Sequence, residues 1–99
     1  MFDVKTAIKN ETLEVKLSGS LDIGGVDLFE EVTSQLDSNS FKSVCIDMQN
    51  MIFMDSTGIG ALISFKRELG DKNFQFTNVN EDIKEIFSII GIEDLFTNE

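Results

Sequence analysis

The sequence predicts an α/β domain in which a β-hairpin precedes alternating helices and strands. Apolar residues recur at every second position near the N-terminus, and they recur at helical spacing in three later segments. The expected order is β-β-α-β-α-β-α, which places helices on one or both faces of a mixed sheet. The 99 residues suit a single domain, 1–99, and 41% hydrophobic residues are enough to fill one core.

Two alternating segments form the expected hairpin. Residues 2–8 and 13–17 alternate between side chains that suit the two faces of a strand. The polar segment 9–12 between them predicts the turn. The segment 19–25 contains three glycines and breaks the alternation, so we expect the second strand to end before it.

A helix and a short strand follow the hairpin. Val26, Phe29, Val32 and Leu36 have helical spacing, and the polar segment 38–40 is expected to close that helix. The apolar segment Val44–Ile46 predicts a strand that is covered on both faces. Its central residue is Cys45, the single cysteine, which we expect to be a small buried core residue.

Two more helices and one more strand complete the pattern. The second helix starts after residues 55–57, and we expect segment 70–73 to end it. Phe74 and Phe76 predict the next strand, with Val79 as an open case. The third helix is expected from Asn80, its N-cap, to Gly91, its stop. The apolar face of the second helix consists of Ile59, Leu62, Ile63 and Leu69, and that of the third helix of Ile83, Ile86, Phe87 and Ile90. The last apolar pair, Leu95 and Phe96, predicts either a short final strand or a contact with the core.

The charge balance restricts the partners of the chain. It has 18 acidic and 8 basic residues, a formal net charge of -10. Nucleic acid is disfavoured because binding phosphates needs clustered Lys and Arg, and an anionic membrane is disfavoured for the same reason. A basic partner is favoured. The longest apolar stretch, Met51–Met54, is too short to span a membrane, and the N-terminus lacks a signal-peptide pattern. We therefore expect a cytoplasmic protein.

The residue types that are missing argue against catalysis. The absence of His excludes Ser-His-Asp and Cys-His sites and metal sites built on His. No CxxC pair or phosphate-binding loop occurs, and Gly58-Ile59-Gly60 is only half of a dinucleotide fingerprint. We expect no enzyme activity, no cofactor and no metal, with Lys or carboxylate bases as the remaining formal route to catalysis.

The most informative segment is Asp55-Ser56-Thr57-Gly58-Ile59-Gly60, where an apolar run ends and a helical pattern begins. Any of its first three side chains could cap the helix. Two glycines in a first turn cost about 1 kcal/mol each relative to Ala, so they need a reason. Either the helix packs tightly on the sheet or another molecule approaches closely, and both reasons can hold together. An exposed hydroxyl here suits a phosphate acceptor or a docking surface.

Two other aspartates leave alternatives open. Asp22 either caps the first helix or contacts a partner. Asp47 follows an apolar run, as the phosphoacceptor of a response-regulator receiver does. The chain is too short for a receiver, and its first strand does not end in the acidic pair that would hold Mg²⁺, so we disfavour that interpretation.

Three segments resemble the STAS domain (sulfate transporter and anti-sigma-factor antagonist), in the bacterial anti-sigma-factor antagonist branch. Gly19-Ser20-Leu21-Asp22 is similar to its Gly-Glu-Leu-Asp element, with Ser20 in place of the usual Glu. Segment 53–60 matches its signature strand-to-helix turn. Segments 86–92 and 95–96 are similar to its C-terminal helix and tail, so the resemblance covers essentially the whole chain.

The resemblance implies a partner-switching protein. Such a protein binds an anti-sigma factor that is also an ATP-dependent serine kinase, and so releases the sigma factor. The kinase phosphorylates the hydroxyl after the motif Asp, here Ser56, with Thr57 as a possible second acceptor; a metal-dependent serine phosphatase reverses this. The docking residues implied are Asp22, Asp55, Ser56, Thr57, Gly58 and Gly60. A monomer or weak dimer is expected. The alternative is a structural STAS subunit of a stress-sensing scaffold or of a lipid-transport complex.

Overall fold

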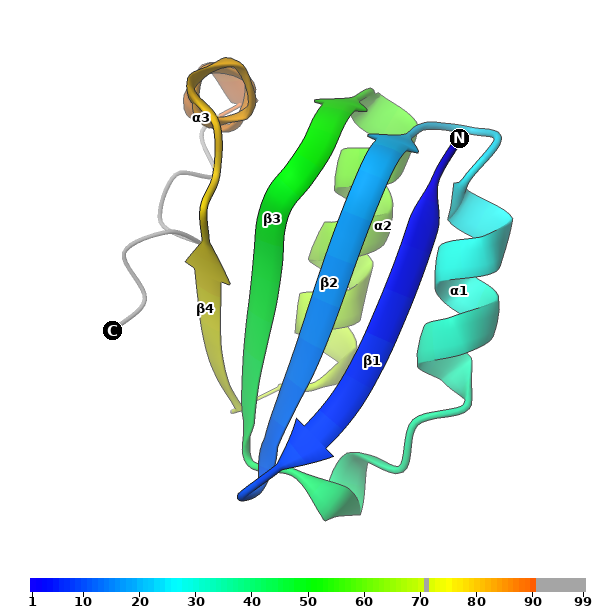
Figure 1. Ribbon diagram of the computed structural model, residues 1–99, viewed down its shortest axis with the longest axis vertical. Helices are drawn as coiled ribbons and strands as arrows, with labels where there is room; N and C mark the ends of the chain where they lie inside the picture. Colours follow the sequence, from blue (N-terminus) through cyan, green and yellow to red (C-terminus); the bar gives the residue numbers. More distant parts are fainter. Residues whose placement is uncertain (71, 91–99) are drawn as a thin grey trace.

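The computed structural model describes residues 1–70 and 72–90 of the chain, in which the elements follow the predicted order. The sheet has the strand order β1-β2-β3-β4; the first pair is antiparallel and the other two pairs are parallel. The mixed α/β class is thereby confirmed (Figure 1). The elements are β1 (Asp3–Lys9), β2 (Thr12–Leu21), α1 (Val26–Ser34), a 3-10 turn (Ser38–Ser40), β3 (Ser43–Met54), α2 (Ser56–Glu68), β4 (Asn73–Thr77) and α3 (Glu81–Ile90).

A two-residue turn joins β1 to β2, as predicted. Lys9 pairs with Thr12, which leaves Asn10 and Glu11 as the central residues of the turn. Both have positive φ, 51° and 66° respectively. Positive φ at both positions is typical of the type I′ turn, whose twist matches that of the flanking strands.

The two central strands are longer than predicted. β2 passes through Gly19 and ends at Leu21, so the expectation that it ends before residue 19 is wrong. Irregular register between Lys16 and Ser18 and between Gly19 and Ser20 carries the strand through. Gly19 has φ +86°, and a Cβ there would overlap the carbonyl oxygen of Met1. The glycine thus continues the strand at a bulge, where we had expected it to break the strand.

Both α1 and α2 lie on one face of the sheet (Figure 1). Residues on β3 alternate, with Val44 and Ile46 buried toward the helices and Cys45 half-buried on the opposite face. In register, Cys45 lies between Glu14 and Gln75, so this face is polar. The predictions of a strand covered on both faces and of a core position for Cys45 are therefore wrong. A three-residue run is too short to reveal that burial alternates over the first six residues of the strand, Ser43–Met48.

The helix ends differ from the predictions in detail. α1 ends at Ser34, and residues 38–40 form a separate 3-10 turn whose cap is Asp37. β4 ends at Thr77, before Val79. Asn80 is confirmed as the cap of α3, because its side-chain oxygen accepts a hydrogen bond from the Ile83 N–H at 2.9 Å. The predictions for Asp71, Gly91, Ile92, Leu95 and Phe96 lie outside the described residues.

A row of aromatic side chains fixes the helices on the sheet. Successive ring centroids in this row are 5.6, 5.8, 6.5 and 6.3 Å apart, and three of the four contacts are edge-to-face. The row crosses from α1 through α2 and β4 to α3, and its members are Phe29, Phe65, Phe74, Phe76 and Phe87. All three helices therefore contribute aromatic side chains to one continuous core.

Candidate partner-binding site

The fold brings the two predicted site segments together. β2 and β3 are parallel neighbours, and their last residues, Leu21 and Met54, are paired. The β2–α1 loop and the β3–α2 junction therefore leave the sheet at the same edge (Figure 1). Asp22 in the first and segment 55–60 in the second lie on neighbouring connections, as the prediction of one docking surface requires.

Asp55 organises the β3–α2 junction. Its backbone is extended, and its carboxylate accepts a hydrogen bond from the Gly58 N–H at 2.9 Å. Its own N–H donates to the Leu21 carbonyl at 3.4 Å, which ties the junction to β2. Of the three possible caps that the sequence offered, Asp55 is the one used. Such a cap is worth about 1 kcal/mol.

Because Asp55 caps the helix, the hydroxyls of Ser56 and Thr57 are not needed for capping. Ser56 is the first residue of α2 and Thr57 the second, and both side chains are exposed. Within the described part of the chain, neither hydroxyl makes a hydrogen bond to another protein atom. The backbone N–H groups of a first helical turn have no intrahelical partner and favour negative charge nearby, and the Asp55 carboxylate already accepts from one of them, that of Gly58.

The two glycines of the junction have different surroundings. A Cβ on Gly58 would overlap the carbonyl oxygen of Leu21, so Gly58 is the point where α2 packs against the end of β2. A Cβ on Gly60 would meet nothing within 4 Å. Gly58 is buried and Gly60 exposed. The two reasons that the sequence suggested therefore fall on separate residues: Gly58 serves packing, and Gly60 leaves open surface.

Asp22 does not cap α1, so that alternative is wrong. Its carboxylate accepts a hydrogen bond from the Gly24 N–H at 2.9 Å, and so closes a turn within its own loop. The N-cap of α1 is Gly25, which offers no side-chain hydrogen bond. The half-exposed carboxylate of Asp22 sits beside a hollow of about 540 Å³ that Met1, Ser20 and Leu28 also line. A contact role for Asp22 stays a prediction.

Three exposed apolar side chains, one in the β2–α1 loop and two near the end of β3, were missed by the sequence analysis. Ile23 is 78% exposed, Ile52 72% and Phe53 48%. Phe53 pairs in register with Ser20, at the end of β3 that extends beyond β4. Regular strand alternation would not have found them, because Met51 and Met54 are buried while Ile52 and Phe53 between them are both exposed. Exposed apolar groups beside a polar loop are typical of a protein interface.

The carboxylate of Asp47 is held by hydrogen bonds within the fold. Its carboxylate accepts hydrogen bonds from the side-chain amide of Asn78 and the N–H of Gln49, both at 3.0 Å. The Asn78 bond is the largest cause that lowers the pKa of Asp47; burial opposes it, and the Gln49 bond and the charge of Lys16 add to it.

In the part of the chain that the structure describes, no group of three His, Cys, Asp or Glu side chains could hold a metal. None of the helices described there has the length and apolar character that a membrane crossing needs.

Comparison by sequence identifies relatives along nearly the whole chain. The sequence profile of the STAS domain family matches residues 3–99. The anti-sigma-B factor antagonist of Staphylococcus aureus (strain NCTC 8325) is 30% identical over 95 residues, which cover 94% of this chain and 88% of the relative. The protein of the same name from Staphylococcus epidermidis is 33% identical with the same coverage.

Solved structures share the fold. An anti-sigma factor antagonist from Mycobacterium paratuberculosis matches with a TM-score of 0.84 at 18% identity, covering 97% of this chain and 83% of the other. SpoIIAA in its unphosphorylated form matches with a TM-score of 0.69 at 21% identity, covering 90% and 83%. The Bacillus cell fate determinant SpoIIAA in its phosphorylated form matches with a TM-score of 0.72 at 21% identity, covering 97% and 88%.

Proposed function

This chain belongs to the STAS domain family, and we propose that it is an anti-sigma-factor antagonist whose binding is switched off by phosphorylation of Ser56. In its unmodified state it binds an anti-sigma factor with serine kinase activity, so that the sigma factor is released. A metal-dependent serine phosphatase returns it to the binding state. The protein acts by binding, in the cytoplasm, where such a kinase finds ATP.

One observation carries this proposal: the Ser56 side chain is exposed at a helix start whose capping is already done by Asp55. A hydroxyl that capped the helix would be held by backbone N–H groups and withdrawn from a kinase. Here the cap comes from the preceding residue. Modification of Ser56 therefore removes no hydrogen bond that the fold uses.

The electrostatic effect of a phosphate differs inside and outside the domain. A phosphoserine adds about -1.5 to -2 charges, which the positive end of α2 accommodates. A carboxylate of a bound partner about 4 Å away would be repelled by several kcal/mol at an effective dielectric constant near 20. Since about 1.4 kcal/mol is a tenfold change in affinity, one phosphate weakens the complex about a hundredfold or more.

The surroundings of Ser56 supply affinity for a partner. Ile23 in the β2–α1 loop and Ile52 and Phe53 near the end of β3 expose apolar surface, and burying it contributes about 25 cal/mol per Å². Gly60 leaves room for the backbone of a partner to approach the first turns of α2. Affinity thus comes from apolar contacts, and control comes from a single charge.

The proposal is tested by capture from a lysate of the source cells with immobilised wild type and with Ser56→Asp, followed by mass spectrometry. We expect an anti-sigma factor kinase on the wild type and at least a tenfold lower yield on Ser56→Asp. Ser88→Asp adds the same charge at an exposed position of α3 and is expected to retain the partner. Equal yields from Ser56→Asp and Ser88→Asp would refute the switch.

Phosphate incorporation identifies the acceptor directly. With the captured kinase and labelled ATP, we expect wild type and Thr57→Ala to incorporate phosphate and Ser56→Ala to incorporate none. Labelling of Ser56→Ala at the wild-type rate would move the acceptor elsewhere. Sedimentation of the purified protein addresses the alternative of a structural subunit, because a scaffold component forms a large assembly and a switch does not.

A further inference from the structure

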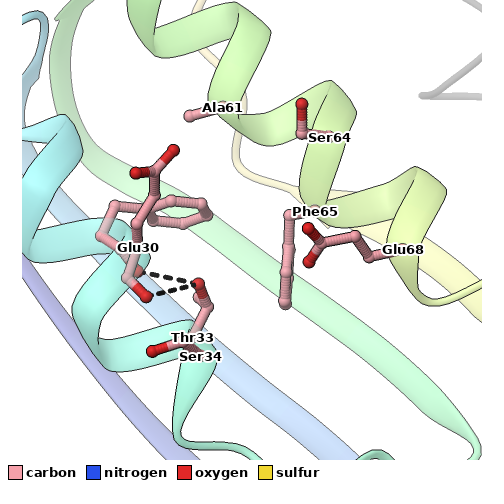
Figure 2. A pocket seen from close by; sticks show the side chains of 8 residues that line it. Glu30, Thr33, Ser34, Ala61, Ser64, Phe65 and Glu68 are labelled. Carbon is pink, nitrogen blue, oxygen red and sulfur yellow. Dashed lines mark hydrogen bonds between the residues drawn. The ribbon is translucent and has the colours of Figure 1, made fainter.

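A groove between α1 and α2 forms a second hollow on the surface, separate from the hydroxyl of Ser56. Its volume is about 330 Å³. Figure 2 shows that its lining comes from two turns of each helix. The lining residues are Phe29, Glu30, Thr33 and Ser34 from α1, and Ala61, Ser64, Phe65 and Glu68 from α2.

The floor of the groove is aromatic. Phe29 and Phe65 pack edge to face at 5.6 Å beneath the groove and are almost fully buried, so they close its floor and expose little surface of their own. The hydroxyl of Thr33 donates to the carbonyl of Phe29 at 2.9 Å, and that of Ser34 donates to the carbonyl of Glu31. These two hydroxyls are therefore engaged by their own helix. What the groove offers a ligand is apolar surface flanked by carboxylates.

The walls of the groove are acidic. The carboxylates of Glu30 on α1 and Glu68 on α2 stand on opposite sides of the gap (Figure 2). No Lys or Arg is among the lining residues. Considering only residues 1–70 and 72–90, the ion pairs are Lys42–Glu11 and Lys84–Glu81, and neither wall carboxylate takes part in one. Two carboxylates over aromatic rings complement a cation that has an apolar stem.

The groove is continuous with the proposed docking surface. Ser56, Gly60, Ser64 and Glu68 are spaced by four residues, so they form one ridge along α2. At 1.5 Å per residue, Ser64 lies about 12 Å along the helix from Ser56. A partner that contacts Ser56 and Gly60 and extends along this ridge of α2 would therefore reach Ser64 and Glu68, which line the groove.

We propose that this groove receives an arginine side chain of the partner bound at Ser56, an inference that rests on the proposed function. The methylene stem of the arginine lies in the hollow above Phe29 and Phe65. Its guanidinium group, which is planar and carries several donors, pairs with Glu30 and Glu68. The groove selects a basic partner, while the phosphate on Ser56 decides whether that partner stays.

The first test uses N-acetyl-arginine amide as the probe and follows the amide signals of the isolated, isotopically labelled protein by NMR. We expect saturable shifts at Thr33, Ala61 and Phe65 with a dissociation constant in the millimolar range. N-acetyl-citrulline amide has the same shape without the charge and is expected to cause none. Equal shifts with both probes, or shifts elsewhere only, would overturn the assignment.

Two double variants provide a matched comparison. Glu30→Gln/Glu68→Gln removes both wall charges, whereas Glu31→Gln/Glu85→Gln removes the same charge from exposed positions outside the lining. We expect the first to lose the arginine-dependent shifts and to bind the captured anti-sigma factor about tenfold more weakly. The second is expected to stay within twofold of the wild type. Equal behaviour of the two variants would refute the groove.

The outcomes distinguish this inference from the proposed function. If the anti-sigma factor binds wild type and not Ser56→Asp, yet binds Glu30→Gln/Glu68→Gln as it binds wild type, the groove assignment fails and the switch stands. If no anti-sigma factor binds but the arginine probe still occupies the groove, the switch fails and the cation site stands.

Discussion

The two connections at the upper edge of the sheet begin alike and end differently. Each starts with an aspartate directly after a strand, Asp22 after β2 and Asp55 after β3. The carboxylate of Asp22 bonds the N–H two residues on, and that of Asp55 bonds the N–H three residues on. The first helix starts at Val26, four residues after Asp22, whereas the second starts at Ser56, directly after Asp55.

This difference shows what decides the role of an aspartate after a strand. At the β3–α2 junction the residue after Asp55 is already helical, so the carboxylate becomes a cap. In the β2–α1 loop the backbone turns first, and Gly25 takes the cap position without a side chain to fill it. At the β3–α2 junction the aspartate therefore caps the helix that begins with Ser56. In the β2–α1 loop the aspartate only closes a turn within the loop.

The largest expected effect comes from filling the glycines of the two connections. The Cβ of Gly58→Ala would overlap a backbone carbonyl, so we expect a loss of about 3 kcal/mol in the free energy of unfolding. The Cβ of Gly25→Ala would meet the side chain of Phe2 near the chain end, and the expected loss is about 1 kcal/mol. Urea denaturation measures both.

Gly60→Ala is the control for this pair. It adds the same methyl group to an open helical position, so we expect a gain of about 1 kcal/mol in the same experiment. A loss for Gly60→Ala as large as that for Gly58→Ala would contradict the division of the two glycines into a packing position and an open one.

The second comparison removes the two carboxylates. Asp55→Ala deletes a helix cap, and we expect a loss of about 1 kcal/mol in unfolding free energy. Asp22→Ala deletes an exposed turn bond, and we expect less than about 0.5 kcal/mol. Equal losses, measured by thermal and urea unfolding, would show that the loop depends on its aspartate as much as the junction does.

Asp47 gives the smallest expected effect and extends the comparison to a third aspartate. Like Asp22 it bonds an N–H two residues on, but Asn78 adds a side-chain bond and keeps the pKa of Asp47 below its ordinary value of 3.8. A lowered folded pKa stabilises the fold above about pH 3.8, and this contribution is lost as the pH falls through the folded pKa. Asp47→Asn should lose less than about 0.5 kcal/mol at neutral pH and have a flatter acid limb in unfolding experiments. Asn78→Ala should flatten it too; an unchanged limb in both variants would contradict the assignment.

Local patterns predicted most of this fold. The hairpin turn, the start of α1 and the cap Asn80 follow from residues a few positions apart, and the structure has them where the sequence placed them. For α2 the sequence left Asp55, Ser56 and Thr57 open as caps, and the structure uses Asp55. The lengths of β2 and β3 did not follow, because Gly19 at a bulge looks the same in sequence as a glycine in a loop. Whether Cys45 is buried also depends on which face of the sheet the helices cover, and segments distant in sequence decide that.

The local geometry at Ser56 was predictable, and the surroundings of the candidate site were not. Ser56 and the capping segment are contiguous in sequence, so their geometry is local. The exposure of Ile52 and Phe53 depends on β3 extending beyond β4, which no local pattern reports. The groove between Glu30 and Glu68 joins residues of two helices far apart in sequence, and only the packing of Phe29 on Phe65 brings them together.

The close approach of Gly58 to the Leu21 carbonyl has a consequence for how fast a switch on α2 can respond. Because α2 packs this tightly against the end of β2, we expect its first turn to keep its backbone shape when Ser56 is modified. On the proposed function, a phosphate would then act through surface charge and without a slow rearrangement of the domain. The rate of the response would be set by the modifying enzymes.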